Sequence, residues 1–424
     1  MKKINYNNFK ETLYWEKLPN GLSVYLLPMK DYKKTYAVLS TNFGSVDTSF
    51  NVNGKLIQQP AGIAHFLEHK LFDKQNYDVF ELFNKTGASA NAFTSFTKTS
   101  YLFSTTMKVR ENLDILLDFV QQPYFTDAKV EKEKHIIKQE INMYKNDPDN
   151  QLYFETIAQM YPDSAMAKDI AGSVESINQI TVNDLNTAYD TFYQPNNMSL
   201  FVVGNIDQDE TLEWVIENQN SKKFNEEIKF KRNINLPKSE GTHKEFLDFD
   251  VVRPKVAIGI RGNDLVPSGD EKIKYEIAIS LFFDLFFSEN ADTYNDLFKN
   301  GIIDDSFSTE FDNQRAYHFA MIASDTDDAD KFISSLDSVL NKMLINLDGL
   351  EDEFILQKNE QLGSYIAMMD SQEAVANQFD PFDEVFNTVY DEVRILDELT
   401  FDDLKKYSHA FMENASFQVK VINN

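Results

Sequence analysis

The sequence predicts an α+β protein made of two duplicated domains, each an antiparallel-rich mixed sheet packed against helices. The 424 residues exceed what a single core ordinarily fills, so two domains are expected. Segments with the two-residue period of strands and segments with the 3.6-residue period of helices occur in both halves. A short pattern of the first half also returns 219 residues later, at Thr400 for Thr181.

The domain boundary is predicted where the composition changes. Residues 220–244 are charged and polar and include Pro237 and Gly241. We therefore expect an N-terminal domain at 1–225, a linker at 226–245 and a C-terminal domain at 246–424.

The first half begins with sheet. Leu18-Pro19-Asn20-Gly21-Leu22 indicates a turn between two strands of a hairpin. The further elements expected in chain order are a strand at 36–42, a polar loop up to Pro60, a helix at 77–85 ended by Gly87, strands within 90–105, a helix with the stripe Leu113, Leu116, Leu117 and Val120, a helix at 126–147 ended by Asp147-Pro148, and a strand at 199–203.

The repeated pattern consists of a helix start followed by a strand. Thr181-x-Asn183-Asp184-Leu185 is echoed by Thr400-x-Asp402-Asp403-Leu404, and each has the spacing of a capping box. At the same offset, Glu140 corresponds to Asn359. His65 and His69 correspond approximately to Asp284 and Ser288, in an apolar helix expected at 275–287.

Composition restricts the possible functions. The formal net charge of −27 opposes binding to nucleic acid, which requires cations to neutralise phosphates. The absence of cysteine excludes disulfides and thiolate metal sites. The N-terminus has two lysines without an apolar segment behind them, and no run is long enough to span a membrane. We expect a cytoplasmic protein with neither a membrane nor a nucleic-acid partner.

The chemistry is predicted by His65-Phe66-Leu67-Glu68-His69. On a helix, positions i, i+3 and i+4 share one face, so both imidazoles and the carboxylate of Glu68 project together. Two histidines at this spacing can bind one Zn²⁺, and Glu68 is placed to take a proton from a water that the metal activates. The order H-x-x-E-H is the inverzincin signature.

A third ligand is expected on the helix at 126–147. Glu133 and Glu140 are seven residues apart, hence on one face, with Ile136, Ile137 and Ile141 around them. A carboxylate in apolar surroundings is costly unless it is paired or bound to metal. We predict Glu140 as the third metal ligand and Glu133 as the residue that orients the site; a solvated acidic face is the alternative.

These residues resemble the pitrilysin-type zinc peptidases. The resemblance rests on residues 65–69, on Gly87-Ala88-Ser89-Ala90-Asn91-Ala92-Phe93-Thr94-Ser95 with Thr99-Ser100-Tyr101, and on the Glu133 and Glu140 pair. It implies one Zn²⁺ per chain held by His65, His69 and Glu140, with Glu68 as general base and Glu133 as a supporting catalytic residue. It also implies that Asn91, Ala92, Phe93 and Tyr101 bind a peptide along an edge strand, a recurrent mode of peptide recognition.

The second half departs from this family. In the family, the second half of an active chain or its partner usually supplies an arginine and a tyrosine seven residues apart around a glycine, whereas the positions around Gly301 hold Leu297 and Asp304. Neither an alkyl side chain nor a carboxylate can donate to an oxyanion, and Arg315 and Tyr317 have the wrong spacing. We therefore expect a homologous partner subunit that supplies both residues.

The function expected is a zinc-dependent endopeptidase that hydrolyses unfolded peptides or leader sequences as the zinc-bearing half of a heterodimer. One alternative is a zinc-bound but catalytically silent assembly subunit. Another is an acidic peptide-binding module that needs no metal. Glu68 argues against a purely structural zinc site, which would have a fourth protein ligand in place of a base.

Overall fold

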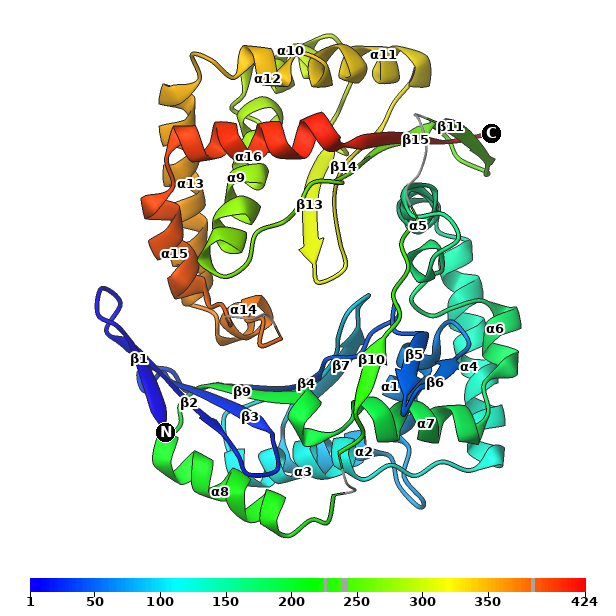
Figure 1. Cartoon of the computed structure of the whole chain (residues 1–424), viewed down its shortest axis with the longest axis vertical. Coiled ribbons are helices and arrows are strands. Elements are labelled where there is room, and N and C mark those ends of the chain that lie inside the picture. Colours follow the sequence, from blue (N-terminus) through cyan, green and yellow to red (C-terminus); the bar gives the residue numbers. More distant parts are fainter. Residues whose placement is uncertain (225–226, 238–242, 383–385) are drawn as a thin grey trace. The chain divides into compact units, whose positions relative to one another are not determined.

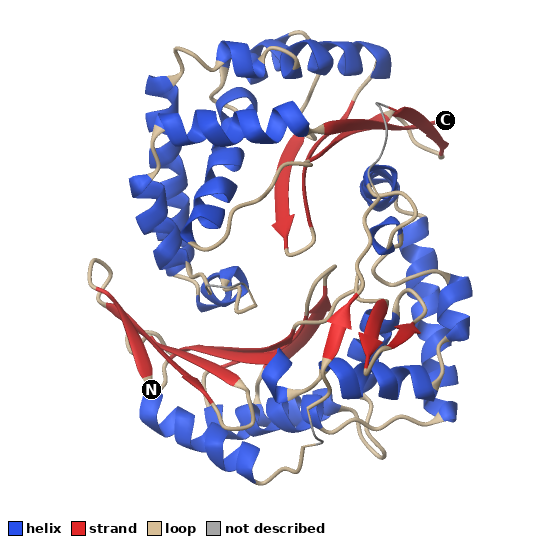
Figure 2. Ribbon diagram, viewed as in Figure 1, coloured by secondary structure: helices blue, strands red, loops and turns tan. Residues whose placement is uncertain are grey.

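The computed structural model describes residues 1–224, 227–237, 243–382 and 386–424, which form two compact units (Figure 1). The first unit consists of residues 1–142, 168–235 and 369–382, and the second of 143–167, 236–368 and 383–424. Each unit combines helices with a sheet, as the α+β prediction requires (Figure 2). The predicted linker at 226–245 lies partly outside the described residues, at 226 and 238–242.

The first unit is built on a seven-stranded sheet. Its strands in spatial order are β1 (Lys2–Tyr6), β2 (Glu11–Lys17), β3 (Ser23–Pro28), β9 (Met198–Gly204), β4 (Thr35–Thr41), β8 (Thr99–Thr105) and β7 (Ser89–Thr94). The neighbours are antiparallel except β3 and β9, which are parallel. The predicted hairpin is confirmed as β2 and β3, and β7 forms an edge of this sheet.

A small second sheet precedes the histidine helix. It consists of β10 (Phe230–Arg232), β5 (Ser49–Val52) and β6 (Lys55–Gln58). The prediction of a polar loop up to Pro60 is therefore wrong in part. Asn53 and Gly54 adopt positive φ angles of 52° and 80° and turn the chain between β5 and β6, and pairing with distant β10 is invisible to local pattern reading.

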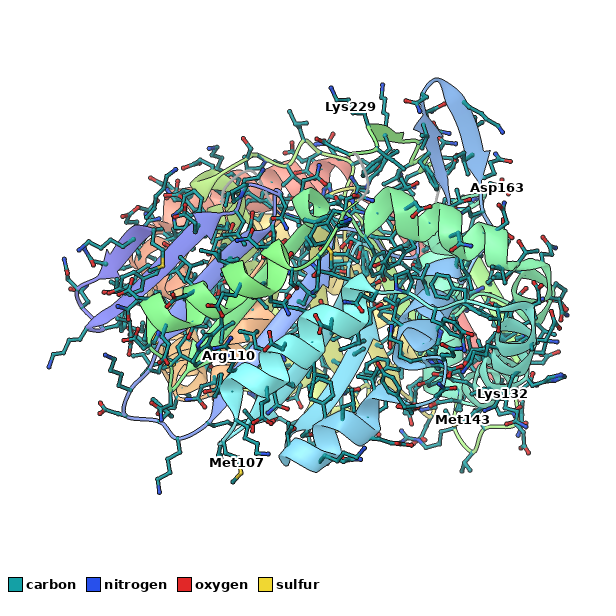
Figure 3. All side chains as sticks on the ribbon, turned by 90° about the horizontal axis from the view of Figure 1, so that it is seen from below. Met107, Arg110, Lys132, Met143, Asp163 and Lys229 are labelled. Carbon is teal, nitrogen blue, oxygen red and sulfur yellow. The ribbon has the colours of Figure 1, made fainter. Side chains whose placement is uncertain are left out.

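The helices of the first unit cover both faces of its main sheet. They are α1 (Ile63–Phe72), α2 (Val79–Thr86), α3 (Val109–Gln121), α4 (Asp127–Lys145), α6 (Val174–Gln179), α7 (Val182–Phe192), α8 (Gln208–Asn220) and α14 (Gln372–Gln378), with a 3₁₀ turn at Pro195–Asn197. The stripe from Leu113 to Val120 is confirmed as the buried face of α3, which packs on β4 and β8. Arg110, on the outer side of α3, reaches Glu217 of α8 at 2.7 Å (Figure 3).

The opposite face of this sheet is covered from far along the chain. Side chains alternate across a strand, so Leu200 and Val202 of β9 join the main core while Phe201 points the other way. There Phe379 stacks on Phe201 at 4.6 Å between ring centroids and meets Tyr25 at 4.8 Å. Helix α14, just before Phe379, packs on β4 and β9. Both strands are consequently buried along their whole length.

The second unit repeats this sheet with five strands. Their order is β11 (His243–Asp248), β15 (Ser416–Asn423), β12 (Lys255–Arg261), β14 (Tyr317–Asp325) and β13 (Ser308–Gln314). The first pair is parallel and the others are antiparallel. The same directions occur in the order β3, β9, β4, β8 and β7 of the first sheet, so β13 is the counterpart of β7.

The helices of the second unit include one from the first half of the sequence. They are α5 (Pro148–Met160), α9 (Asp270–Phe287), α10 (Asp292–Lys299), α11 (Ala329–Leu340), α12 (Met343–Asn346), α13 (Glu351–Met369), α15 (Val389–Glu398) and α16 (Phe401–Asn414), with a 3₁₀ turn at Ala165–Ala167. Helix α9 packs on β13, α15 and α16, whereas α5 packs on β12 and β15.

The two halves thus exchange equivalent helices. Helix α5 precedes residue 225 yet covers β12 and β15, and α14 follows residue 245 yet covers β4 and β9. Since β4 and β9 correspond to β12 and β15, the exchange is reciprocal. The contiguous ranges 1–225 and 246–424 do not include it, because an amphipathic pattern shows that a helix has an apolar face without showing which sheet it covers.

Several predicted ends of helices are confirmed. Gly87 ends α2 in the left-handed conformation, with φ of 74°. Thr181 and Thr400 form capping boxes with Asp184 and Asp403 at the starts of α7 and α16. Asp147 and Pro148 follow α4 as predicted, and they also begin α5, with Asp147 as its N-cap.

One packing prediction on α4 is wrong. Ile137 and Ile141 are fully buried as expected, but Ile136 is 44% exposed. Ile136 lies one position, or about 100°, around the helix from Ile137, which turns it toward solvent. None of the helices within the described residues is both long and apolar enough to cross a bilayer.

The capping boxes support a stability prediction. Thr181→Ala removes the hydroxyl that accepts from the backbone N–H of Asp184, and loss of such a cap costs about 1 kcal/mol. We expect a decrease of that size in the free energy of unfolding, measured by urea denaturation. Thr181→Ser keeps the hydroxyl and serves as the control; an equal loss in both variants would contradict the capping role.

Candidate metal and catalytic site

Helix α1 begins with a turn that requires glycine. Gly62, immediately before Ile63, has φ of 87°. A Cβ atom on Gly62 would lie 2.4 Å from the carbonyl oxygen of Ala171, which is closer than any real contact. Further along α1, His65 and His69 are four residues apart and therefore lie on one face of the helix, with 4.6 Å between their ring centroids.

Helix α4 brings Glu140 against both histidines. Nε2 of His65 lies 3.8 Å from Oε1 of Glu140, and Nε2 of His69 lies 3.6 Å from Oε2. One ligand atom from each residue can be chosen so that all three lie within 4.8 Å of one another. In a tetrahedral zinc site with bonds of 2.0 to 2.1 Å, ligand atoms are about 3.3 Å apart, so the donor set and its spacing fit zinc.

The histidines have different electrostatic surroundings. Burial, together with the positive charge that His69 can carry, lowers the pKa of His65 to about 3. Burial also lowers the pKa of His69, but its hydrogen bond to Glu133 and the charges of Glu68, Glu133 and Glu140 outweigh burial and raise that pKa overall. His65 is therefore neutral at neutral pH, with a lone pair available for a metal ion.

Glu133 lies behind the candidate ligands. Its Oε1 is 3.1 Å from Nδ1 of His69, and its Oε2 accepts from Nζ of Lys70 at 3.2 Å. Burial opposes the charge of Glu133, but the hydrogen bonds and charges of His69 and Lys70 dominate and lower its pKa. Glu133 is thus a carboxylate, and Nδ1 of His69 carries the proton while Nε2 faces Glu140.

Glu68 lies on the same side of α1 and is 8% exposed. Its Oε2 accepts a hydrogen bond of 2.6 Å from the hydroxyl of Thr94, the last residue of β7. Burial raises the pKa of Glu68, and the hydrogen bond from Thr94 counteracts part of that increase. A carboxylate with a raised pKa can accept a proton and hold it through a reaction step.

The predicted peptide-binding residues divide into two groups. Asn91, Ala92 and Phe93 lie on β7, which pairs with β8 along one edge, and within the described residues no strand pairs with its other edge. The N–H of Ala92 is bonded to the side-chain oxygen of Asn91 at 2.9 Å. Tyr101 differs: it is fully buried, and its hydroxyl lies 2.8 Å from that of Tyr193, so the structure does not support a direct substrate contact by this side chain.

Sequence reasoning missed two contacts of the site. Thr94 bonds Glu68 although 26 positions separate them, and Lys70 bonds Glu133 across 63 positions. Only the charge of Lys70 among the apolar residues of α1 could have drawn attention to it, because a buried ammonium needs a carboxylate partner.

The equivalent place in the second half has different chemistry. Asp284 and Ser288 lie at the end of α9, where Ser288 accepts from Gln357 of α13 at 2.9 Å. Burial, with a smaller contribution from the charge of Glu360, raises the pKa of Asp284 to about 6. The one group of potential metal ligands among the described residues is that of the first unit.

Close to Gly301 in the sequence, Asp304 takes part in an ion pair. Asp304 accepts from Arg253 at 2.6 Å, and Leu297 is buried at 8% exposure. Tyr317 is also buried, and its hydroxyl donates to Asp312 at 2.9 Å. None of these three residues is an available donor for a developing oxyanion.

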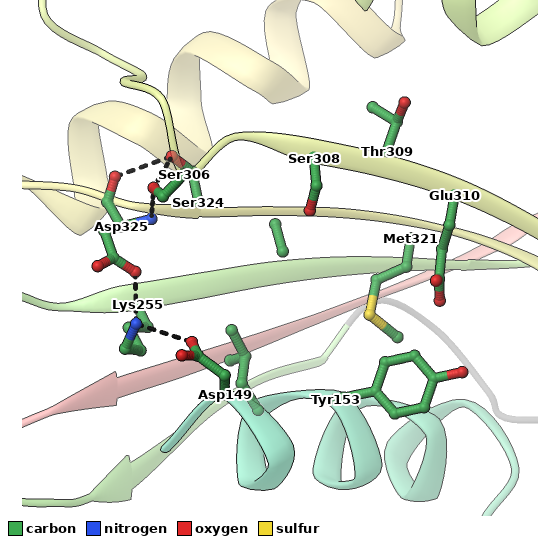
Figure 4. A pocket seen from close by; sticks show the side chains of 12 residues that line it. Asp149, Tyr153, Lys255, Ser306, Ser308, Thr309, Glu310, Met321, Ser324 and Asp325 are labelled. Atoms are coloured by element: carbon green, nitrogen blue, oxygen red, sulfur yellow. Dashed lines mark hydrogen bonds and ion pairs between the residues drawn. The ribbon is translucent and has the colours of Figure 1, made fainter. Parts of the chain in front are cut away.

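A polar cavity of about 500 Å³ lies between α5, β13 and β14 in the second unit (Figure 4). Lys255 bonds Asp149 and Asp325 at its wall, both at 2.7 Å. Ser306 donates to Asp304 and accepts from the N–H of Asp325. These polar groups form ion pairs and hydrogen bonds with one another, which is typical of a cluster that stabilises the fold.

Comparison with known proteins agrees with this geometry. Residues 56–174 match the model of the insulinase family, peptidase family M16, and residues 179–357 match the peptidase M16 inactive domain. The chain is 42% identical over 410 residues to the uncharacterized zinc protease YmfH of Bacillus subtilis, covering 96% of this chain and 95% of that protein.

Solved structures show the same architecture. A protein described as an M16-like peptidase from Alicyclobacillus acidocaldarius has a TM-score of 0.88 at 30% identity, covering 97% of this chain and 99% of that one. A protease from Helicobacter pylori gives 0.81 at 19% identity, covering 97% and 99%. The fold and site define a metallopeptidase class with an inverted zinc motif. The chain belongs to the pitrilysin-type M16 peptidase family.

Asp284 provides a test of how the second half is stabilised. Its folded pKa is raised from 3.8 to about 6, so the folded state holds the proton more tightly and stability is lost as the pH rises through that range. We expect Asp284→Asn to stabilise the protein at pH 8 by about 2 kcal/mol and to have little effect near pH 3.5. Urea denaturation at both pH values measures this.

The control for this prediction is Glu360→Gln, which removes the neighbouring charge. It should lower the pKa of Asp284 and make the pH dependence of stability smaller without abolishing it. Equal effects of Asp284→Asn at pH 3.5 and pH 8 would contradict the assignment.

Proposed function

We propose that this chain is a zinc-dependent endopeptidase in which His65, His69 and Glu140 hold one metal ion and Glu68 is the general base. The observation that carries the proposal is the convergence of two imidazole Nε2 atoms and one carboxylate, with a second carboxylate beside them. Three protein ligands with an adjacent base are typical of catalytic rather than structural zinc.

Zinc bound there would polarise a peptide carbonyl and lower the pKa of a water molecule. Glu68 would take the proton of the attacking water at a carboxylate oxygen and later deliver it to the leaving amine. The hydroxyl of Thr94 occupies Oε2 of Glu68, which leaves Oε1 for this transfer. Glu133 would keep the proton of His69 on Nδ1, so that Nε2 stays available.

Strand β7 supports an extended peptide as the substrate. A peptide added to its edge at Asn91, Ala92 and Phe93 would run toward Thr94, whose hydroxyl touches Glu68. Backbone pairing of this kind requires an extended, unfolded segment of the peptide and depends little on which side chains that segment carries. Unfolded peptides or leader sequences are therefore the proposed substrates.

A homologous partner subunit is part of the proposal. Leu297 and Asp304 stand where the family pattern has arginine and tyrosine, and Asp304 is engaged by Arg253. The second candidate function, a zinc-bound assembly subunit without catalysis, is favoured by the same observation. The two differ in whether a partner restores peptide cleavage.

The first experiment compares zinc content and cleavage. Glu68→Gln should keep stoichiometric zinc and lower kcat by about 10³-fold, because general base catalysis contributes 10² to 10⁴; Glu140→Gln should lose the metal. Zinc is measured by atomic emission and cleavage with a quenched-fluorescent peptide library. Exposed Glu81→Gln on α2 is the control and should leave both unchanged. Cleavage at the parent rate by Glu68→Gln would overturn the proposed role.

A second experiment concerns the partner. We expect the zinc-loaded chain alone to cleave at a small fraction of the rate seen after addition of a homologous subunit that carries the Arg and Tyr pair. Full cleavage by the chain alone would remove the need for a partner, whereas no cleavage in either condition would favour the silent subunit.

A further inference from the structure

A buried lysine follows the second histidine of α1. The side chain of Lys70 is 1% exposed, and its ammonium lies 3.2 Å from Oε2 of Glu133 and 2.6 Å from Oδ2 of Asp73. Burying an ammonium is costly unless carboxylates compensate its charge. This group is therefore committed to its two partners.

The contacts of Lys70 belong to a continuous series of alternating charges. His69 bonds Oε1 of Glu133, Glu133 bonds Lys70, and Lys70 bonds Asp73. Asp73 in turn accepts from Lys129, which also donates to the carbonyl oxygen of Lys74 at 2.7 Å. The series thus ties the end of α1 to the first half of α4.

The geometry places Glu133 between two consecutive residues of α1. His69 and Lys70 project about 100° apart around the helix, and each engages a different oxygen of the same carboxylate. With Oε2 held by Lys70, Oε1 is directed at Nδ1 of His69. Nδ1 of His65 has no hydrogen-bond partner among the described residues, so within the histidine pair the contact with Glu133 holds His69 alone.

The same contacts set the distance between the helices. Glu133 and Glu140 share a face of α4, two turns apart. A displacement of Glu133 relative to α1 would therefore also move Glu140 relative to Nε2 of His65 and His69. Residues behind metal ligands typically contribute 10- to 100-fold in metal affinity.

We propose that Lys70 is a positioning residue of the metal site, which fixes Glu133 so that His69 and Glu140 converge on the ion, with Asp73 and Lys129 holding the ammonium in place. This inference rests on the proposed zinc site. It assigns to α1 a fourth functional position, directly after its second histidine.

The experiment is a double-mutant cycle on zinc affinity, measured by competition with a chromophoric chelator. We expect Lys70→Met to weaken zinc binding about 10-fold, since methionine keeps the volume and removes the cation. Glu133→Gln should weaken it similarly, and adding Lys70→Met to Glu133→Gln should cost less than a further twofold. The visible spectrum of the Co²⁺-substituted protein should change in both single variants.

Lys134→Met is the matched control. Lys134 is a buried lysine too, at 7% exposure, but it lies on α4 and bonds Glu131 and the carbonyl oxygen of Asn178. It should lower stability without changing zinc affinity or the Co²⁺ spectrum. An equal loss of affinity in Lys134→Met would mean that any buried lysine has this effect, and the proposal would fall.

Further outcomes separate this inference from the proposed function. If the parent chain binds zinc and Lys70→Met binds it within twofold, the role of Lys70 is wrong while the zinc site stands. If the parent binds no zinc, the proposed function fails with it. Should Lys70→Met give no folded protein, Asp73→Asn, which removes one of the two carboxylates that hold the ammonium of Lys70, replaces it; an unchanged zinc affinity and an unchanged Co²⁺ spectrum in that variant likewise overturn the proposal.

Discussion

Charge compensation in a place with little water is the constraint on which the site depends. Helices α1 and α4 carry two histidines, several lysines and several carboxylates into partly or fully buried positions. Unpaired, each charge there would cost several kcal/mol. In the observed arrangement Glu133 lies between His69 and Lys70, so one carboxylate compensates both of these side chains. The same arrangement leaves the candidate ligand atoms facing each other, so one set of contacts would serve both stability and the proposed metal binding.

The candidate site could be read from the sequence as far as its contacts follow helical spacing. His65, Glu68 and His69 within α1, and Glu133 with Glu140 within α4, are related by positions i, i+3, i+4 and i+7, and the structure brings the two sets together. Contacts between elements were not predictable: Thr94 reaches Glu68 only because β7 packs beside α1. The exposure of Ile136 and the burial of Tyr101 likewise depend on neighbours that no local pattern identifies.

In the fold, too, features set by neighbouring residues were predictable, whereas contacts between segments far apart in the sequence were not. Capping boxes at Thr181 and Thr400 and the glycine that ends α2 are local, and the structure has them where they were predicted. The strands between 49 and 58 pair with each other through the turn at Asn53-Gly54, a local hairpin signal that the prediction of a polar loop overlooked. The pairing of β5 with β10, more than 170 positions away, was not predictable from local pattern. The duplicated sheet order was implied by one repeated pattern, and the second copy has Asp284 and Ser288 approximately where the first has its two histidines.

The reciprocal exchange of α5 and α14 has a consequence for how the chain can be divided. A cut in the segment between 226 and 245 yields two fragments, each lacking the helix that covers β4 and β9 or β12 and β15. Each fragment would expose one face of two strands that are largely buried in the intact chain. Each would also keep a helix that covers the sheet of the other fragment. The two halves therefore repeat one sheet order, but neither carries all of the helices that cover its own sheet, and neither is a portable module. A catalytic half made for engineering would have to carry a copy of residues 369–382 with it.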